Sequence, residues 1–190
     1  MLWLYNIISY IALIIYLPVL CTKRGPHERK VFVKERLGLS KYEPSDVWLH
    51  AVSVGEFFAA LPYLKQLEKE FPQLQITISV TTHTGLQVAR ANFTSAKRIM
   101  YMPLDVGFIV ARVIKQLQPK LFITMETEIW PNLIRILKDH RAKVMLLNGR
   151  MSASSFHNYQ KIKPLMLSVL KKIDLLGMQD ETGRQQMHQL

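Results

Sequence analysis

The sequence contains a single cysteine in 190 residues, which excludes a disulfide framework. Its six histidines are scattered: they form no HExxH motif, and none has a second histidine one helical turn away. No group of cysteines and histidines has the spacing of a zinc site. We therefore expect neither a bound metal nor a cofactor.

Disorder and repetition are also absent. Hydrophobic residues make up 49% of the chain and charged residues 21%, which is the composition of a folded domain. No internal repeat or low-complexity linker interrupts the sequence. A chain of this length fits one domain with a substantial core, or half of a two-domain enzyme.

Acidic residues are scarce, and the imbalance is local. Against 25 Lys and Arg stand 14 Asp and Glu, a net charge of +11. Residues 22–41 have an excess of five positive charges, which suits the phosphates of a nucleic acid or of a membrane surface. The basic residues of this segment are Lys23, Arg24, Arg29, Lys30, Lys34, Arg36 and Lys41, opposed by Glu28 and Glu35.

The segment before it, residues 1–21, has no charged side chain. About 20 apolar residues are what a helix needs to cross the hydrocarbon core, and positive charge just after a span keeps the next domain cytoplasmic. We therefore predict a membrane anchor helix over 1–21, a basic juxtamembrane segment over 22–46, and no nucleic-acid partner. Two alternatives stay open: a helix lying in the membrane interface, and an apolar hairpin docked on the domain.

From residue 47 onward, short apolar runs alternate with amphipathic stretches. The runs lack strict alternation, as expected of strands covered on both faces. Strands alternating with helices predict an α/β domain over 47–190 with a Rossmann-like, doubly wound parallel sheet. A nucleotide-binding Rossmann enzyme is disfavoured because no GxGxxG follows the first run. The predicted strands are 47–53, 75–82, 98–103, 120–126, 143–149 and 173–179.

Ligands of such sheets bind at the carboxyl ends of the strands. Polar and small residues follow one predicted strand after another, and two carboxylate positions plus an Asn-Gly-Arg exceed what turns and helix caps require. These segments are Ser53 to Glu56, Thr81 to Gly85, Pro103 to Asp105, Glu126 to Glu128, Asn148 to Ser152, and Gln179.

Glu56 admits two interpretations. Ser53-x-x-Glu56 matches a capping box, in which each side chain bonds the backbone of the other residue. A helix N-terminus also stabilises an ionised carboxylate, which is acceptable for a general base but not for an acid. Gly55 leaves no side chain to obstruct a substrate. The spacing permits catalysis without requiring it.

The stretch "METEIWPNL" (125–133) is harder to explain by structure alone. Glu126 and Glu128 alternate about Thr127, so on a strand they point to opposite sides. One carboxylate then faces the crevice while the other caps a helix starting near Pro131. Trp130 either stacks on a sugar ring or wedges the helix against the sheet.

Several motifs together resemble one family. "SVGE", "TTHTG", "MPLD", "METEIWPNL", "NGRMSASSFHNY" and "GMQDETGRQQMHQL" occur in this order and spacing in the Kdo transferases of Gram-negative bacteria, which move 3-deoxy-D-manno-octulosonic acid (Kdo) from CMP-Kdo to a lipid A precursor. The resemblance implies the GT-B architecture, two Rossmann-like domains facing across a cleft. This chain resembles the N-terminal, acceptor-binding half. Family members are roughly twice as long, as two domains of ordinary size require, so the donor domain is expected to be absent here.

The resemblance also implies residue roles. Glu56 matches the general base that deprotonates the acceptor hydroxyl, with inversion at the Kdo anomeric carbon. Glu126 matches a carboxylate that supports the transition state, for which oxocarbenium character gives a physical basis. Arg150 suits an acceptor phosphate or the sugar-acid carboxylate, or else forms a structural ion pair with Asp105 or Glu128. The substrate-binding residues implied are Ser53, Gly55, Thr82, Thr84, Gly85, Asn148, Arg150 and Ser152.

The expected function is therefore the N-terminal part of an inverting Kdo transferase of lipopolysaccharide synthesis. Its expected partners are a lipid A precursor, CMP-Kdo held by the absent C-terminal domain, and the anionic inner-membrane surface on its cytoplasmic side. Two alternatives remain: another GT-B membrane glycosyltransferase, and a non-catalytic, membrane-tethered module that binds anionic lipid.

Overall fold

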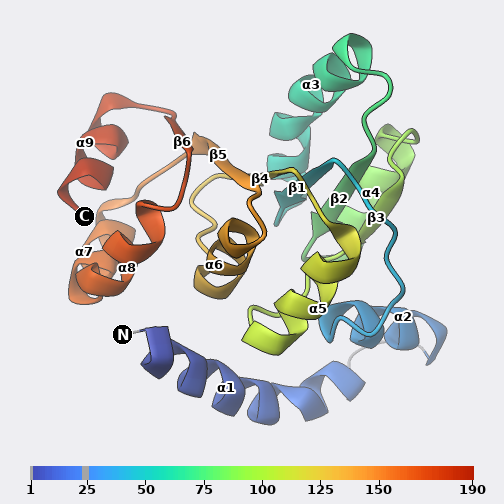
Figure 1. The fold of residues 1–190 in the computed structure, drawn as a ribbon, viewed down its shortest axis with the longest axis horizontal. Coiled ribbons are helices and arrows are strands. Elements are labelled where there is room, and N and C mark those ends of the chain that lie inside the picture. The colour runs from blue at the N-terminus through green and yellow to red at the C-terminus, as the bar shows by residue number, and fades with distance from the viewer. Residues whose placement is uncertain (1, 23–25) are drawn as a thin grey trace.

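The computed structural model describes residues 2–22 and 26–190, without the side chains of residues 19–22, 26 and 27. Its centre is a six-stranded sheet in the order β3-β2-β1-β4-β5-β6, in which every described strand pair is parallel (Figure 1). In register, Val47 of β1 lies opposite Ile76 of β2 and Leu121 of β4. The predicted parallel α/β sheet is confirmed. The strands are β1 Val47–Ala51, β2 Ile76–Val80, β3 Arg98–Tyr101, β4 Leu121–Met125, β5 Lys143–Gly149 and β6 Leu175–Met178.

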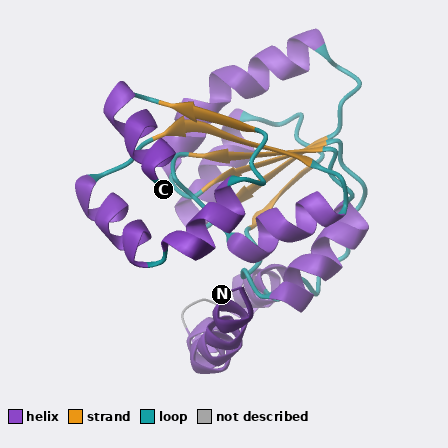
Figure 2. Ribbon diagram, turned by 60° about the vertical axis from the view of Figure 1, so that its left-hand side comes forward, coloured by secondary structure: helices purple, strands orange, loops and turns teal. Residues whose placement is uncertain are grey.

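Helices follow the strands and cover both faces of the sheet (Figure 2). Their starts obey local chemistry: Ser53, Thr82, Ser152 and Asp180 each cap a helix by accepting a backbone N–H bond. These helices are α3 Val54–Glu70, α4 His83–Asn92, α5 Gly107–Leu117, α6 Pro131–Asp139, α7 Ala153–Lys161, α8 Lys163–Leu170 and α9 Glu181–Gln189.

The core has two layers, one on each face of the sheet. Successive residues of a strand point to opposite faces, so β1 contributes Trp48 to one layer and Leu49 to the other. The Trp48 layer lies under α5, α6 and α8. In this layer the Trp48 ring meets the Phe122 ring edge to face, with 5.1 Å between the ring centroids. The Leu49 layer lies under α3 and α4. Because both faces are covered, the strands read as apolar runs without alternation.

The strand order places a topological switch at β1 and β4. From β1 the chain moves outward to β2 and β3 and then returns to β4 on the other side of β1. Connections on either side therefore diverge, leaving a crevice at the carboxyl ends of β1 and β4, where ligands bind in such sheets. Glu56 follows β1, and Glu126 and Glu128 follow β4.

A helix forms at the N-terminus, but the predicted membrane span is not supported. α1 runs over Leu2–Thr22. Across the residues that the structure describes, no helix is both long and apolar enough to cross a membrane. α1 instead lies along the domain below α5 (Figure 1), where the Tyr5 hydroxyl donates to Asp105 Oδ2 at 2.7 Å and the Tyr10 ring stacks on Phe108.

The basic segment is only partly a solvent-facing surface. Lys23 and Arg24 lie outside the described residues. Residues 26–36 form α2 (Pro26–Arg36), in which Lys30 and Lys34 are exposed. Arg36 is buried, where it donates to the carbonyl oxygens of Met102 and Thr81, so its predicted role at a phosphate surface is wrong.

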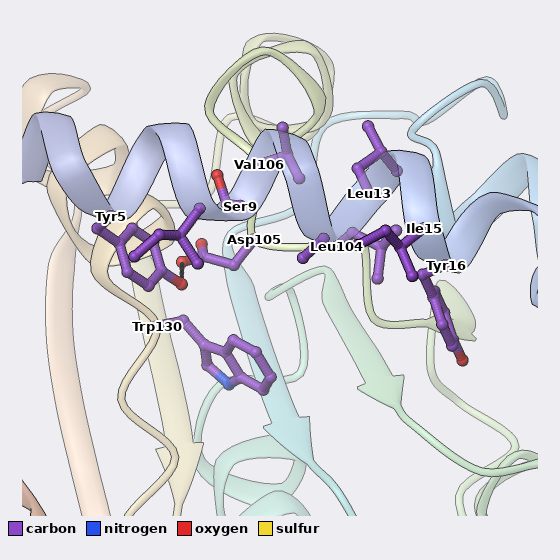
Figure 3. Close-up of a pocket in the computed structure, with 11 residues that line it drawn as sticks. Tyr5, Ser9, Leu13, Ile15, Tyr16, Leu104, Asp105, Val106 and Trp130 are labelled. Carbon is purple, nitrogen blue, oxygen red and sulfur yellow. Dashed lines mark hydrogen bonds between the residues drawn. The ribbon is translucent and has the colours of Figure 1, made fainter.

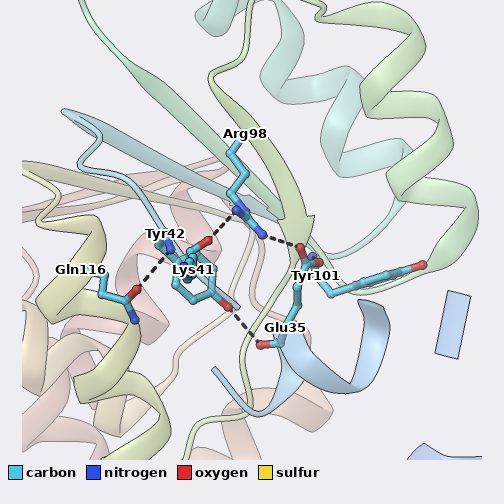
Figure 4. A network of polar contacts seen from close by, with 6 residues as sticks. All are labelled: Glu35, Lys41, Tyr42, Arg98, Tyr101 and Gln116. Atoms are coloured by element: carbon cyan, nitrogen blue, oxygen red, sulfur yellow. Dashed lines mark hydrogen bonds and ion pairs between the residues drawn. The ribbon is translucent and has the colours of Figure 1, made fainter. Parts of the chain in front are cut away.

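A polar network joins α2 to the sheet (Figure 4). The buried Glu35 carboxylate accepts from the Arg98 guanidinium and from the Tyr101 backbone N–H, each at 2.8 Å. Arg98 also donates to the Lys41 carbonyl, and its guanidinium lies over the Tyr42 ring. Burial, with the Glu35 charge adding to it, raises the Tyr42 pKa to about 12. The segment between α2 and β1 is therefore part of the folded domain.

Candidate active site

The candidate site lies at the carboxyl ends of β1, β4 and β5, where the sequence placed its acidic and Asn-Gly-Arg motifs. Three glutamates approach each other there from two connections: Glu56 in the first turn of α3, and Glu126 and Glu128 between β4 and α6. Their charges interact, because Glu126 acts on Glu56 and both act on Glu128.

Glu56 forms the predicted capping box with a small difference. Its backbone N–H donates to Ser53 Oγ at 3.2 Å, as expected. Its carboxylate reaches back to the Val52 N–H, at 2.8 Å, one residue before the cap. One carboxylate oxygen is thus held by the backbone. Gly55 leaves open space beside it, since a Cβ built there would meet only Ser53 Oγ, at 3.8 Å.

The ionisation of Glu56 differs from the sequence-based expectation. A helix N-terminus alone favours the ionised form. In the fold, burial raises the pKa of Glu56, the Val52 N–H lowers it, and the Glu126 charge raises it again. Burial outweighs the backbone donors, so the pKa of this carboxyl moves upward, toward the range in which a general base is effective.

The backbone at Glu126 is unusual. β4 ends at Met125, and Glu126 has φ 53°, in the left-handed region that non-glycine residues rarely adopt. Asn148 near the end of β5 has φ 57°. Such conformations cost about 1–3 kcal/mol each and concentrate at functional sites. Strand alternation therefore stops before Glu126, and with it the basis for placing Glu126 and Glu128 on opposite sides.

The pKa of Glu128 is strongly raised. Burial raises its pKa to about 7, and the charges of Glu56 and Glu126 contribute to this rise. Burial and Glu128 also raise the pKa of Tyr159, whose hydroxyl donates to the Thr127 carbonyl at 3.4 Å. A carboxyl group titrating near neutrality beside two others is able to take up or release a proton during a reaction.

The β5 edge of the site contains both structural and free groups. The Asn148 carbonyl accepts from Gln179 Nε2 at 3.2 Å, and the Arg150 carbonyl accepts from the Thr127 hydroxyl. Ser152 caps α7 by accepting from the Ser155 N–H at 3.1 Å. The Arg150 side chain is exposed and forms no ion pair among the described residues, so the predicted pairs with Asp105 or Glu128 are not present.

The β2 edge is mainly structural. Thr82 Oγ1 accepts from the Gly85 N–H at 3.0 Å and so caps α4. A Cβ at Gly85 would lie 2.9 Å from the same oxygen, which explains the glycine. Thr84 is exposed and stays a candidate ligand. The binding roles of these three residues remain predictions.

Asp105, not Glu128, caps α6. Its carboxylate accepts from the backbone N–H groups of Asn132 and Leu133, at 3.0 and 2.7 Å, while the Asn132 side chain donates to the Asp105 carbonyl. Burial raises the Asp105 pKa, while the Tyr5 hydroxyl and these N–H groups lower it. Asn132 is fully buried, and its side chain ties α6 to the Asp105 loop.

Two aromatic rings lie beneath the glutamates. The His50 ring on β1 meets Trp130 edge to face at 6.4 Å. His50 is fully buried, and burial lowers its pKa to about 4, so its imidazole is neutral. His50 Nε2 and Trp130 Nε1 are both buried without a hydrogen-bond partner in the described part of the chain.

Among the side chains that the structure describes, no three of His, Cys, Asp or Glu gather in a way that could hold a metal ion. The arrangement offers acid–base chemistry from carboxyl groups, with a guanidinium and small hydroxyl groups at the rim.

Fold and site together define a Rossmann-like α/β domain with three glutamates gathered at its switch point. The model of the 3-deoxy-D-manno-octulosonic-acid transferase (kdotransferase) family matches residues 32–190. The chain belongs to the Kdo transferase family. The matched region includes all six strands and every glutamate of the candidate site.

Known relatives agree with the family. The 3-deoxy-D-manno-octulosonic acid transferase of Haemophilus influenzae is 42% identical over 137 residues, 72% of this chain and 32% of that protein. The Chlamydia pneumoniae transferase of the same description is 31% identical, over 95% of this chain and 43% of its own length. A bifunctional glycosyltransferase/methyltransferase of Fusobacterium nucleatum is also 31% identical, over 97% and 29%. The chain thus matches between 29% and 43% of the length of these relatives.

One solved structure shares the fold. UDP-N-acetylglucosamine 2-epimerase superimposes with a TM-score of 0.56 at 11% sequence identity, over 78% of this chain and 43% of that one. At this identity the likeness concerns the fold alone.

Sequence reasoning missed three features of the site: the near-neutral pKa of Glu128, the Tyr159 hydroxyl, and the buried His50, which is held at Nδ1 by Ser79 and has no partner for Nε2 in the described part of the chain. Tyr159 was within a quoted motif, on α7, but nothing in its spacing linked it to the loop after β4. His50 lies inside an apolar run, where a histidine carries no signal of its surroundings.

Proposed function

We propose that this chain is the acceptor-binding domain of an inverting, GT-B Kdo transferase that moves Kdo from CMP-Kdo to a lipid A precursor. The observation that carries the proposal is the three-glutamate cluster at the β1–β4 crevice in a chain of this family. The nucleotide would be held by a second domain facing the crevice.

In this proposal Glu56 is the general base. Its carboxylate takes the proton of the acceptor hydroxyl as that oxygen forms a bond to the anomeric carbon of Kdo. The bond between that carbon and the CMP phosphate oxygen breaks, and CMP leaves with the electron pair on the opposite face. Support comes from the raised pKa of Glu56, the anchoring of one oxygen on Val52, and the open space at Gly55.

Glu126 and Glu128 take different roles. Glu126 is assigned to stabilise positive charge developing on the Kdo ring, which a nearby carboxylate favours electrostatically. Glu128, with a pKa near neutrality, is suited to receive the proton from Glu56 and pass it to water. Keeping Glu128 protonated also limits the negative charge that the carboxylate of an incoming sugar acid would meet.

Binding of the acceptor is assigned to the rim and to the membrane side. The exposed, unpaired Arg150 suits a phosphate or carboxylate through its guanidinium fork. α1 exposes several large apolar side chains, including Ile14 and Ile15. α2, the next helix in the chain, exposes Lys30 and Lys34. A helix lying in the interface of an anionic membrane, on its cytoplasmic side, accounts for this combination.

The test is transfer of labelled Kdo from CMP-Kdo to a lipid A precursor by the protein made from the complete reading frame. Wild type is compared with Glu56→Gln, which keeps the shape of the side chain but removes the base. A loss of roughly a hundredfold or more in kcat, with folding intact, supports the assignment. Asp180→Ala is the control for a purely structural loss, because it weakens the cap of α9 by about 1 kcal/mol and leaves the base in place.

Three outcomes of this experiment would change the proposal. Equal losses in Glu56→Gln and Asp180→Ala would return Glu56 to a purely structural role and move the search for the base to Glu126 or Glu128. Absence of transfer by wild type would refute the enzyme proposal and leave the lipid-binding module. Competition by UDP rather than CMP would point to a different nucleotide-sugar donor.

A further inference from the structure

We propose that the cavity between α1 and the domain binds one alkyl chain of a phosphate-bearing lipid. The cavity has a volume of about 610 Å³, within the range of small-molecule sites. One wall is α1, and the other is the Leu104–Val106 segment together with Trp130 (Figure 3).

The walls are apolar, and several of their polar groups are already bonded within the protein. The Tyr5 hydroxyl donates to Asp105, and Ser9 Oγ donates to the Asn6 carbonyl. On the other wall, the backbone N–H of Leu104 donates to the Arg36 carbonyl oxygen, and the backbone N–H of Val106 donates to the Leu104 carbonyl oxygen. These groups have no need of a polar ligand. A hydrocarbon occupant therefore gains burial without leaving them unpaired.

Exposure and charge around the cavity favour a lipid. Ile14 and Ile15 of α1 are 72% and 71% exposed, and Trp3 is 67% exposed. An apolar surface of this extent on a folded protein marks an interaction site. α2 follows the C-terminal end of α1 in the chain, and its exposed Lys30 and Lys34 provide positive charge there. Hydrocarbon beside basic groups is complementary to an alkyl chain with an anionic phosphate.

Trp130 links the wall of the cavity to the candidate active site. This residue lines the cavity and also contacts His50, and it follows Glu126 and Glu128 on the same loop. In Figure 3 its indole lies across the cavity from α1, beyond the Tyr5–Asp105 hydrogen bond. That this lipid is the acceptor rests on the proposed function; the binding of the chain does not.

The test uses tryptophan fluorescence of this chain with the Trp3→Phe change, which removes the exposed indole. The probe is dodecyl phosphate brominated near the chain end, added below its micelle concentration, because bromine quenches only indoles that it contacts. Inorganic phosphate is the headgroup control. Trp48 is fully buried in the core, so quenching is assigned to Trp130 by its loss in Trp3→Phe/Trp130→Phe.

Two matched substitutions on α1 separate the cavity from the outer surface. Ala12 lines the cavity, and Ala12→Phe fills it. Ile11 is 52% exposed and does not line the cavity, and Ile11→Phe adds an aromatic ring there. We expect quenching that saturates at one probe per chain and an affinity at least about tenfold weaker in Ala12→Phe, a loss of about 1.4 kcal/mol, with little change in Ile11→Phe.

Other results overturn the proposal. Quenching that never saturates, or that both substitutions weaken equally, would mean only non-specific attachment to α1. A dimer that blocks the probe would mean that a second copy covers the cavity. If Ala12→Phe fails to fold by circular dichroism, Ser9→Leu fills the same space and takes its place. Because the assay contains no Kdo donor, its failure leaves the transfer proposal standing, and loss of transfer activity leaves the cavity proposal standing.

Discussion

The pKa of Glu128 allows a quantitative test of the glutamate cluster. The perturbation is Glu128→Gln, which keeps the shape of the side chain and removes its ionisation. Burial and the neighbouring carboxylates raise the Glu128 pKa from 4.5 to about 7. The folded state therefore favours the protonated form. Its contribution to stability is complete below pH 4.5 and is lost as the pH rises toward about 7.

The magnitude follows from that shift. At about 1.4 kcal/mol per pKa unit, the rise from 4.5 to about 7 corresponds to about 3 kcal/mol at full strength. Glu128 is only partly buried, so solvent screening reduces this to about 1–2 kcal/mol. Relative to wild type, Glu128→Gln should thus be about 1–2 kcal/mol more stable near pH 8 than near pH 5, or roughly 2–8 °C in Tm.

The assay is urea and thermal unfolding of both proteins at the two pH values, with Glu68→Gln, on the exposed side of α3, as the control for removing one negative charge. A gain in stability that is the same at both pH values, or the same in the control, would refute the reasoning. It would mean that Glu128 ionises as it does in the unfolded chain, and that the three carboxyl groups do not interact.

Three further predictions concern α2, α1 and the rim. Glu35→Ala should lower the free energy of unfolding by about 3 kcal/mol, because it leaves Arg98 and the Tyr101 N–H without their buried partner; Glu28→Ala, on the exposed side of α2, is the control for urea denaturation. Tyr5→Phe should cost about 1.5 kcal/mol by the same measurement, since it removes a hydrogen bond to the Asp105 carboxylate, and an unchanged midpoint would mean that α1 is not docked. Arg150→Ala should change stability by less than about 0.5 kcal/mol while weakening acceptor binding, measured as KM; a destabilised variant would reveal a structural role.

The glutamates show which properties of a site a local sequence motif can predict. Ser53 and Glu56 are three residues apart in one helical turn, so the capping bond follows from local geometry and was predictable. The pKa of Glu56 depends on burial and on a charge seventy positions along the chain, and the local rule gave the opposite direction. The same limit applies to Glu128, whose neighbours come from two different connections.

Asp105 shows a second limit. Spacing suggested that a residue just before α6 would cap it, because most caps are adjacent in sequence. The actual cap comes from the loop after β3, twenty-seven residues earlier, and it also holds Tyr5 of α1. A cap supplied by a distant loop leaves no periodic or adjacent pattern to detect.

The N-terminal segment shows a third limit of prediction from the sequence. Twenty-one uncharged residues predict a helix correctly, and α1 forms over nearly the same range. Hydropathy by itself does not distinguish a helix surrounded by lipid from one that lies on a protein, because both bury apolar side chains. The contacts of Tyr5 and Tyr10 with the domain were decided by the tertiary structure.

By itself the sequence determined the six strands, the parallel α/β class, the helix start at Ser53, and the family. Each of these follows from periodicity, from hydrogen bonds between near neighbours, or from ordered motifs. Only the tertiary structure decided which charges are buried, which carboxyl groups interact electrostatically, and what caps α6. It also decided that a cavity lies between α1 and the domain. Burial and electrostatic interaction depend on distance in space, which residues far apart in the chain acquire only after folding.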